Sequence, residues 1–388
     1  MKKIIILFSI FLITNISLTT SDPLEDLLGG LLGGILGGVL GTLKNLLRNL
    51  LGSTLLLSEE DLSDLAEKLK ELSKLGYKIS SEELLKRAKE IAEINRLAGG
   101  EWTAHFNLES LLPLEVQKRL CGSFTTKANK GNDDEDGADE DGPPREKRQA
   151  RRSKRAASCT YNIEFDARDR WPGCKSFINY VQTQGHCGSC WAHSAASCYT
   201  DRYCIDQAKK GASIPFNASY IFSAYEILSC SRENGCKGGS EEEAYGWIKK
   251  NGICTGTDYQ RQDGCKPYPF NLATKSPQPT VKDVGILEGE DNIKIELSRY
   301  GSVSASFNAY EDFHYYKDGV YSHVWGYKPI GHSVVIVGYG TATCDGKKIP
   351  FWIIRNSYSI TWGMGGFFYM RRGYNECDVE KYISYPIF

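Results

Sequence analysis

The stretch Gln184-Gly185-His186-Cys187-Gly188-Ser189-Cys190-Trp191-Ala192 is the most informative part of this sequence. Gly185 and Gly188 interrupt regular structure ahead of Cys190, and the following WAHSAASCYTDRYCIDQA, residues 191–208, is typical of a helix with a buried face. We therefore expect Cys190 at or next to the N-terminus of a helix, where the helix dipole favours a thiolate. A thiolate is a nucleophile, so the placement predicts a reactive cysteine.

Two distant residues have the chemistry of a base and its orienting partner. His332 lies in GHSVVIVGYG, an apolar run that predicts a buried strand, and Asn356 lies at the end of FWIIRNS, a second such strand. They follow Cys190 by 142 and 166 residues. A cysteine nucleophile needs a base, and the base needs a group that holds its productive tautomer.

At these residues the chain resembles the papain family of cysteine proteases, and most closely its cathepsin B-like members. Besides CGSCWA at 187–192, the resemblance rests on FDAR at 165–168, CKGG at 236–239, GCKPY at 264–268, GVY at 319–321, GHS at 331–333 and NSY…WG…GFF at 356–368. INRLAGGEWTAHFN at 94–107 and KRLCGSF at 118–124 are similar to the short cathepsin B propeptide. The resemblance implies an α+β fold with a helical lobe, a β-barrel lobe and an active site in the cleft between them.

The resemblance also implies a role for each matching residue. Cys190 matches the nucleophile, His332 the histidine that forms an ion pair with it, and Asn356 the residue that orients the imidazole. Gln184 matches the side-chain oxyanion donor, acting with the backbone N–H of Cys190. The pair Gly238 and Gly239 matches the glycines that let a substrate backbone approach closely. No cofactor and no metal are implied.

Departures from the family pattern concern substrate binding. Tyr358 stands where the family usually has a tryptophan that shields the Asn–His hydrogen bond, whereas Trp362 matches the second tryptophan of that segment. Ser306 and Ser333 align with small residues of the specificity pocket, and Tyr382 aligns with the acidic residue at its base. We therefore expect a shallow pocket without a carboxylate, which disfavours Arg and accepts apolar or aromatic side chains at the second residue before the scissile bond.

A second departure concerns the insertion with paired histidines that gives cathepsin B its carboxydipeptidase activity. Here GCKPYPFNLATKSPQPTVKDV, residues 264–284, passes directly to the next strand and contains no histidine. The sequence therefore predicts an open cleft and endopeptidase activity.

Thirteen cysteines indicate an oxidising compartment. The resemblance implies the disulfides Cys174–Cys204 and Cys187–Cys236, and suggests Cys230–Cys265. Pairing among the other cysteines of the C-terminal region stays open: Cys159, Cys198, Cys254, Cys344 and Cys377. Asn217 begins an N-glycosylation triplet.

The composition changes along the 388 residues. Residues 1–21 resemble a signal peptide. The Gly/Leu-rich residues 22–57 are interpreted as a low-complexity spacer, with membrane association as the alternative. Residues 58–124 predict an inhibitory propeptide, in which capping boxes at Ser58 and Ser80 begin two amphipathic helices. An acidic and then polybasic linker at 125–155 carries dibasic processing sites, and residues 156–388 form the protease domain.

These observations predict a secreted or lysosomal cysteine endopeptidase made as a zymogen. Its partners would be protein or peptide substrates, its own propeptide and cystatin-type inhibitors. The net charge of −1 argues against nucleic acid as the main partner. The alternative is a papain-fold binding protein or decoy with a weakened site, for which Tyr358 and His193, a position where the family usually has Phe, are the only support.

Overall fold

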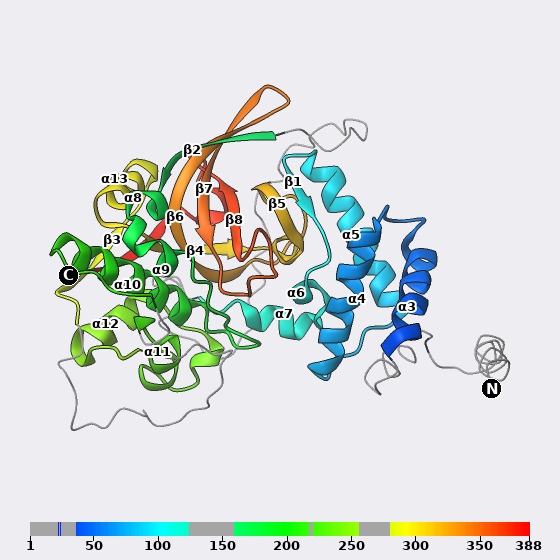
Figure 1. The fold of residues 1–388 in the computed structure, drawn as a ribbon, viewed down its shortest axis with the longest axis horizontal. Coiled ribbons are helices and arrows are strands. Elements are labelled where there is room, and N and C mark those ends of the chain that lie inside the picture. Colours follow the sequence, from blue (N-terminus) through cyan, green and yellow to red (C-terminus); the bar gives the residue numbers. More distant parts are fainter. Residues whose placement is uncertain (1–21, 23, 25–35, 124–158, 217–219, 256–279) are drawn as a thin grey trace. The chain divides into compact units, whose positions relative to one another are not determined.

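The computed structural model describes residues 22, 24, 36–123, 159–216, 220–255 and 280–388 (Figure 1). Several of the sequence-based expectations lie outside these residues: the signal peptide, much of the Gly/Leu-rich segment, the processing linker, glycosylation at Asn217, the Cys230–Cys265 bridge and most of the segment 264–284. The chain divides into two compact units. One comprises residues 1–93 with 106–113, and the other residues 94–105 with 114–388.

The first unit is helical. Its elements are α3 (Leu36–Leu51), α4 (Glu59–Lys74), most of α5 (Ser81–Ala98) and α6 (Leu108–Leu111). The predicted capping box at Ser58 is confirmed, since its side chain accepts from the Asp61 N–H and Asp61 accepts from the Ser58 N–H. The α4 leucines at 62, 65, 69 and 72 are all buried, as their helical spacing predicted. None of the described helices is both long and apolar enough to cross a membrane.

A buried carboxyl group gives this unit a pH dependence. Burial raises the pKa of Glu109 in α6 from 4.5 to about 7, although Lys68 opposes the shift. Since the unfolded chain ionises at lower pH, the contribution of Glu109 to stability is complete below pH 4.5 and is lost as pH rises toward 7, by about 3 kcal/mol. We expect hydrogen-exchange protection of α4 and α6 to fall between pH 5 and pH 8, and Glu109→Gln to remove this fall. An equal fall in both proteins would contradict the assignment.

The second unit contains a nine-stranded sheet in the order β1-β5-β8-β7-β6-β4-β9-β3, with β2 paired to β6. All pairs are antiparallel except β5 with β8. The strands are β1 (Trp102–Ala104), β2 (Cys159–Asp166), β3 (Asp283–Leu287), β4 (Val303–Ala309), β5 (Tyr316–Tyr321), β6 (Ile330–Cys344), β7 (Lys347–Arg355), β8 (Phe367–Arg371) and β9 (Tyr382–Ile387). The centre of the sheet, β6 and β7, is the predicted pair of apolar strands.

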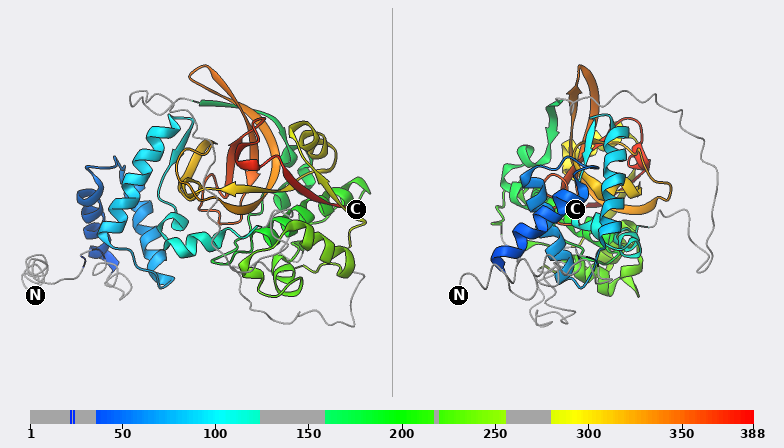
Figure 2. Two further views of the ribbon diagram at one scale, coloured as in Figure 1. Left: turned by 180° about the vertical axis from the view of Figure 1, so that it is seen from behind. Right: turned by 90° about the vertical axis from the view of Figure 1, so that its right-hand side faces the viewer.

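Helices gather on one side of this unit and strands on the other, as both figures show (Figures 1 and 2). Its helices are α7 (Leu114–Leu120), α8 (Ala167–Arg170), α9 (Lys175–Ile178), α10 (Cys190–Lys209), α11 (Ala224–Cys230), α12 (Glu241–Asn251) and α13 (Glu290–Tyr300). Short 3-10 turns are η1 (Pro172–Cys174), η3 (Gly235–Lys237), η6 (Glu311–Tyr315) and η7 (Glu376–Asp378). The expected α+β class and two-lobed arrangement are confirmed.

Helix α10 is the centre of the packing. Trp191, Ala195 and Tyr199 face a helical core with Phe222, Ala244 and Ile248. Cys198 faces a second core, which includes Val335 and Ile353 of the sheet. Most residues of α10 are buried, and they lie on nearly every side of the helix. Its sequence therefore shows little of the alternation between apolar and polar faces that a surface helix has.

Three disulfides are formed among the described residues: Cys159–Cys344, Cys174–Cys204 and Cys187–Cys236. The second and third are the pairs that the resemblance implied. The first joins residues that sit opposite each other in the β2–β6 register, so the sheet itself brings the two sulfurs together. Its loop spans 185 residues, and closing a long loop restricts the unfolded chain most strongly.

Candidate active site

Cys190 is the first residue of α10, as its sequence context predicted, and its side chain is fully buried. The loop before it is fixed by the Cys187–Cys236 disulfide and by the Gly188 N–H, which donates to the Cys236 carbonyl at 3.1 Å. A Cβ on Gly188 would lie 2.5 Å from that carbonyl oxygen, so this close approach requires glycine. The thiol is therefore held at the positive end of the helix.

His332 and Asn356 lie together at one end of the sheet. His332 is near the start of β6, and Asn356 directly follows the last residue of β7. The Nε2 atom of His332 is 2.8 Å from Oδ1 of Asn356, which also accepts from the Ser357 N–H at 2.8 Å. Because a carboxamide oxygen only accepts, Nε2 carries the hydrogen, and the neutral ring presents Nδ1 as an acceptor. This Nδ1 has no hydrogen-bond partner among the described residues.

The sheet meets the helix at the thiol. The backbone N–H of Ser333, the residue after His332, donates to the Cys190 sulfur and lowers its pKa. Burial is the larger effect and raises the pKa of Cys190 to about 11. Burial likewise lowers the pKa of His332 to about 4, although the Asn356 hydrogen bond opposes this shift. In this covered state a neutral thiol faces the sheet beside a neutral imidazole.

The cover is the segment Cys121–Ser123, which runs across the thiol. The Gly122 N–H lies 3.4 Å from the Cys190 sulfur, and the Gly122 carbonyl accepts from the Gly239 N–H at 2.9 Å. Ser123 forms a parallel bridge with Gly239 and donates its N–H to the Gly331 carbonyl at 2.9 Å. The sulfur thus meets an N–H donor rather than a carbonyl carbon. This segment fills the site without presenting a bond for attack.

Positions 238 and 239 both require glycine, the first for its backbone conformation and the second for lack of space. Gly238 has a φ angle of +110°, a backbone conformation that residues other than glycine rarely adopt. A Cβ on Gly239 would lie 2.5 Å from the Trp191 indole. Together they provide a backbone edge against which an extended chain pairs, as Gly122 and Ser123 do here.

Gln184 is fully buried and points toward the covering segment. Its Nε2 donates to the Leu120 carbonyl at 2.7 Å and to the Cys187 carbonyl at 2.9 Å. Ser357 fixes the other end of the amide by donating to Oε1 at 2.7 Å. A pre-oriented amide donor therefore lies where an acceptor oxygen of an incoming chain arrives.

Aromatic rings cover the His332 side of the site. The ring centroid of Tyr358 lies 4.9 Å from that of His332, and Trp362 packs edge-on against Tyr358 at 5.5 Å. The Tyr358 hydroxyl is 3.4 Å from the Cys121 sulfur, so it also contacts the covering segment. His193 lies elsewhere, buried in α10 with its Nδ1 2.9 Å from the Ser189 carbonyl.

The predicted pocket residues do lie together, but one expectation about them is wrong. Ser306 stands directly opposite both Ser333 and Tyr382 in the sheet register, and the two serine hydroxyls are 3.2 Å apart. The expected absence of a carboxylate is contradicted by Glu241, whose two oxygens each accept from the Ser306 hydroxyl at 3.0 Å. The resemblance pointed only to the position of Tyr382, whereas Glu241 reaches the pocket from the first turn of α12.

Sequence reasoning also missed how the segment Cys121–Ser123 fills the site. A Cβ on Gly122 would lie 2.4 Å from the Gly188 carbonyl oxygen, so Gly122 allows this approach. The sequence signals for these two features are Cys-Gly-Ser at 121–123 and the three successive glutamates that follow Ser240. Nothing in one sequence says which glutamate turns inward.

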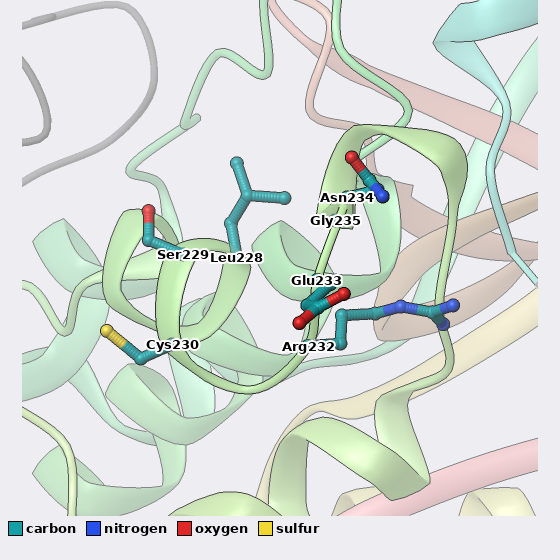
Figure 3. A pocket seen from close by; sticks show the side chains of 7 residues that line it. All are labelled: Leu228, Ser229, Cys230, Arg232, Glu233, Asn234 and Gly235. Atoms are coloured by element: carbon teal, nitrogen blue, oxygen red, sulfur yellow. The ribbon is translucent and has the colours of Figure 1, made fainter.

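A separate surface pocket of about 660 Å³ is lined by Leu228, Ser229, Cys230, Arg232, Glu233, Asn234 and Gly235 (Figure 3). None of the candidate catalytic or substrate-binding residues lines it. Among the described residues, no cluster of His, Cys, Asp and Glu side chains could hold a metal ion.

Comparison with known proteins gives consistent matches. The family model for papain family cysteine proteases matches residues 161–387. The cathepsin B-like cysteine proteinase 4 of Caenorhabditis elegans is 35% identical over 263 residues, which cover 58% of this chain and 74% of that protein. A cathepsin B-like cysteine proteinase of Schistosoma japonicum is 35% identical over 253 residues, covering 56% and 70% of the two chains.

Solved proenzymes share the fold. The structure of procathepsin B S9 from Trypanosoma congolense matches with a TM-score of 0.56 and 28% identity, over 77% of this chain and 97% of that one. The proform of the ragweed allergen Amb a 11, a cysteine protease, has a TM-score of 0.60 at 22% identity, over 86% and 98% of the two chains.

Proposed function

The chain belongs to the papain family of cysteine proteases, and from that premise we propose that it is a cathepsin B-like endopeptidase whose segment 121–123 blocks the site until processing. The family accounts for cysteine-type peptidase activity and for a zymogen. The observation that carries the finer proposal is the 2.8 Å contact between His332 Nε2 and Asn356, which leaves Nδ1 as an acceptor on the sheet end that meets Cys190.

The proposed reaction uses these groups in sequence. His332 Nδ1 accepts the thiol proton, and the Cys190 thiolate attacks the scissile carbonyl carbon to form a C–S bond. The imidazolium then protonates the leaving amine as the C–N bond breaks, which gives a thioester. Water, deprotonated by His332, cleaves the thioester and regenerates the thiol. Asn356 holds the ring in the tautomer that both steps need.

Gln184 is the proposed side-chain donor to the oxyanion. Its Nε2 already donates to a carbonyl oxygen of the covering chain, that of Leu120, at 2.7 Å. With the backbone N–H of Cys190 it would stabilise negative charge on the tetrahedral intermediate. Ser357 keeps the amide in place, so the donor is pre-organised.

A zymogen requires that the covering chain be held on the enzyme. Glu101 makes ion pairs with Lys347, at 2.6 Å, and with Arg371. The indole of Trp102 donates to the Ser322 carbonyl at 3.0 Å and packs against Tyr321. These contacts anchor residues 101–104 beside β5.

Cellular location and exopeptidase activity rest on parts of the chain outside the described residues. We propose secretion or lysosomal delivery, with cleavage at the dibasic sites of residues 145–155. The absence of a histidine insertion after GCKPY supports endopeptidase rather than carboxydipeptidase activity.

The test is hydrolysis of internally quenched peptides at mildly acidic pH with a reducing agent. Wild type and Cys190→Ala are both cleaved near Arg155 by an added protease, and processing is verified by mass. We expect the substitution to lower kcat by at least about 10⁴-fold, because it removes the nucleophile itself. If neither processed protein cleaves any peptide, the proposal fails and the chain is better regarded as a binding protein or decoy.

A further inference from the structure

Glu241 is a buried carboxylate in the pocket beside the candidate nucleophile. It is the first residue of α12, and only 5% of its surface is exposed. Ser240 caps the helix with its side chain, so the chain enters α12 in a fixed direction. This geometry turns Glu241 toward the sheet, whereas Glu243 on the same helix is exposed and pairs with Arg232 at 3.1 Å.

Two serine hydroxyls and a backbone N–H, but no cation, stabilise the Glu241 carboxylate. Ser306 donates to it at 3.0 Å, and Ser333 also hydrogen-bonds to it. Among the described residues, no Lys, Arg or His side chain lies within ion-pair distance of it, and the neighbouring Glu242 adds repulsion. Burial is the main effect and raises the pKa of Glu241. A buried negative charge without a cation is costly, so the pocket is poorly matched to an apolar occupant.

Ser123 shows how an occupant enters this pocket. Its backbone pairs with Gly239 and Gly331, and its hydroxyl lies 2.7 Å from that of Ser306. One serine hydroxyl therefore separates the occupant's side chain from the Glu241 carboxylate. The Ser123 side chain is too short to reach the carboxylate directly. A longer side chain at the same position would reach it.

We propose that Glu241 selects Lys or Arg at the second substrate residue before the scissile bond. The proposal rests on the proposed function, because it assumes that a substrate backbone pairs with Gly239 as the covering segment does. A basic side chain entering beside Ser306 would give Glu241 the cation that it lacks and would keep the serine hydrogen bonds. This reverses the preference for apolar side chains expected from Tyr382 alone.

Matched peptides that differ only at that position test the proposal. One contains Arg and the other citrulline, its uncharged isostere, and both are hydrolysed by the processed protein at pH 7. A charge-assisted hydrogen bond in a buried site predicts that kcat/KM is about tenfold to hundredfold higher for Arg. Glu241→Gln should bring the ratio close to one, and Glu241→Asp should retain part of the preference. Glu243→Gln, an exposed change on the same helix, should keep the wild-type ratio.

The outcomes separate this inference from the proposed function. No preference for Arg in the wild type, or an unchanged ratio in Glu241→Gln, would overturn the role of Glu241 while the peptidase activity stands. Loss of hydrolysis of every peptide by the wild type would overturn the proposed function instead. If Glu241→Gln does not fold, a synthetic peptide of residues 115–123 with Arg in place of Ser123 serves as an inhibitor of the wild type. It should bind at least about tenfold more tightly than the native peptide, and weaker binding would contradict the proposal.

Discussion

Alkylation of Cys190 in the full-length chain at pH 7 is expected to be at least about a thousandfold slower than in the processed protein. With the pKa of Cys190 at about 11, only about one thiol in 10⁴ is ionised at pH 7, and the thiolate is the reactive form. Removal of segment 121–123 admits water and uncovers His332, so the ion pair can form. Short labelling with iodoacetamide, followed by mass analysis of the Cys190 peptide and of the intact chain, measures the difference.

The sign of the pH dependence follows from the same shift. In the full-length chain the labelling rate should rise about tenfold for each pH unit above 7, because the thiolate fraction grows until the pH reaches about 11. In the processed protein the rate should change far less, since its thiolate is already populated. Fast labelling of the intact full-length chain at pH 7 would show that residues 121–123 do not cover the thiol.

Gly122→Ala should displace the covering segment from Cys190 while it leaves Cys190, His332 and Asn356 unaltered. The new Cβ would lie 2.4 Å from the Gly188 carbonyl oxygen, and a backbone atom cannot move aside cheaply. We expect at least about tenfold faster labelling of Cys190 in this full-length variant. Gly173→Ala is the matched control, because no atom lies within 4 Å of its added Cβ.

The sequence alone predicted the parts of the site that have local signals. Cys190 begins α10 because the glycines before it and the helix after it leave one place for the start. His332 and Asn356 were found on apolar strands, and the β6–β7 register brings those strand ends together. Such features depend on short stretches of chain, so one sequence is enough to identify them.

The rest depends on contacts between distant segments. Glu241 and Tyr382 both reach Ser306, one from a helix and one from a neighbouring strand, and composition does not say which side chain turns inward. The Cys159–Cys344 bridge required the β2–β6 register, which no spacing in the sequence reveals. The neutral state of the thiol likewise follows from burial under a segment about 70 residues earlier in the chain.

The ion pair between Asp201 and Arg355 joins the two halves of the site. Asp201 lies on α10, the helix that begins with Cys190, and Arg355 is the last residue of β7, directly before Asn356. Their side chains are 0% and 2% exposed, and Arg355 Nη2 lies 2.8 Å from Asp201 Oδ2. Ser302 donates to the same oxygen at 2.6 Å, while the Phe177 and Ile178 carbonyls accept from Arg355.

Removing one partner of this pair is expected to lower the free energy of unfolding far more than replacing both partners with apolar residues. Burial raises the pKa of Asp201 more than Arg355 lowers it, so desolvation offsets much of the attraction and the intact pair adds little net stability. Asp201→Ala leaves a buried, unpaired guanidinium and should lower the free energy of unfolding by about 3–5 kcal/mol. The double variant Asp201→Leu/Arg355→Met should lose clearly less stability than Asp201→Ala.

Denaturant unfolding of the processed protein, in a Cys190→Ala background that prevents self-digestion, measures each loss. Lys249→Ala breaks an exposed pair with Asp283 and should lower the free energy of unfolding far less than Asp201→Ala does. A double variant at least as unstable as Asp201→Ala would contradict this expectation, because the loss would then not come from the unpaired charge.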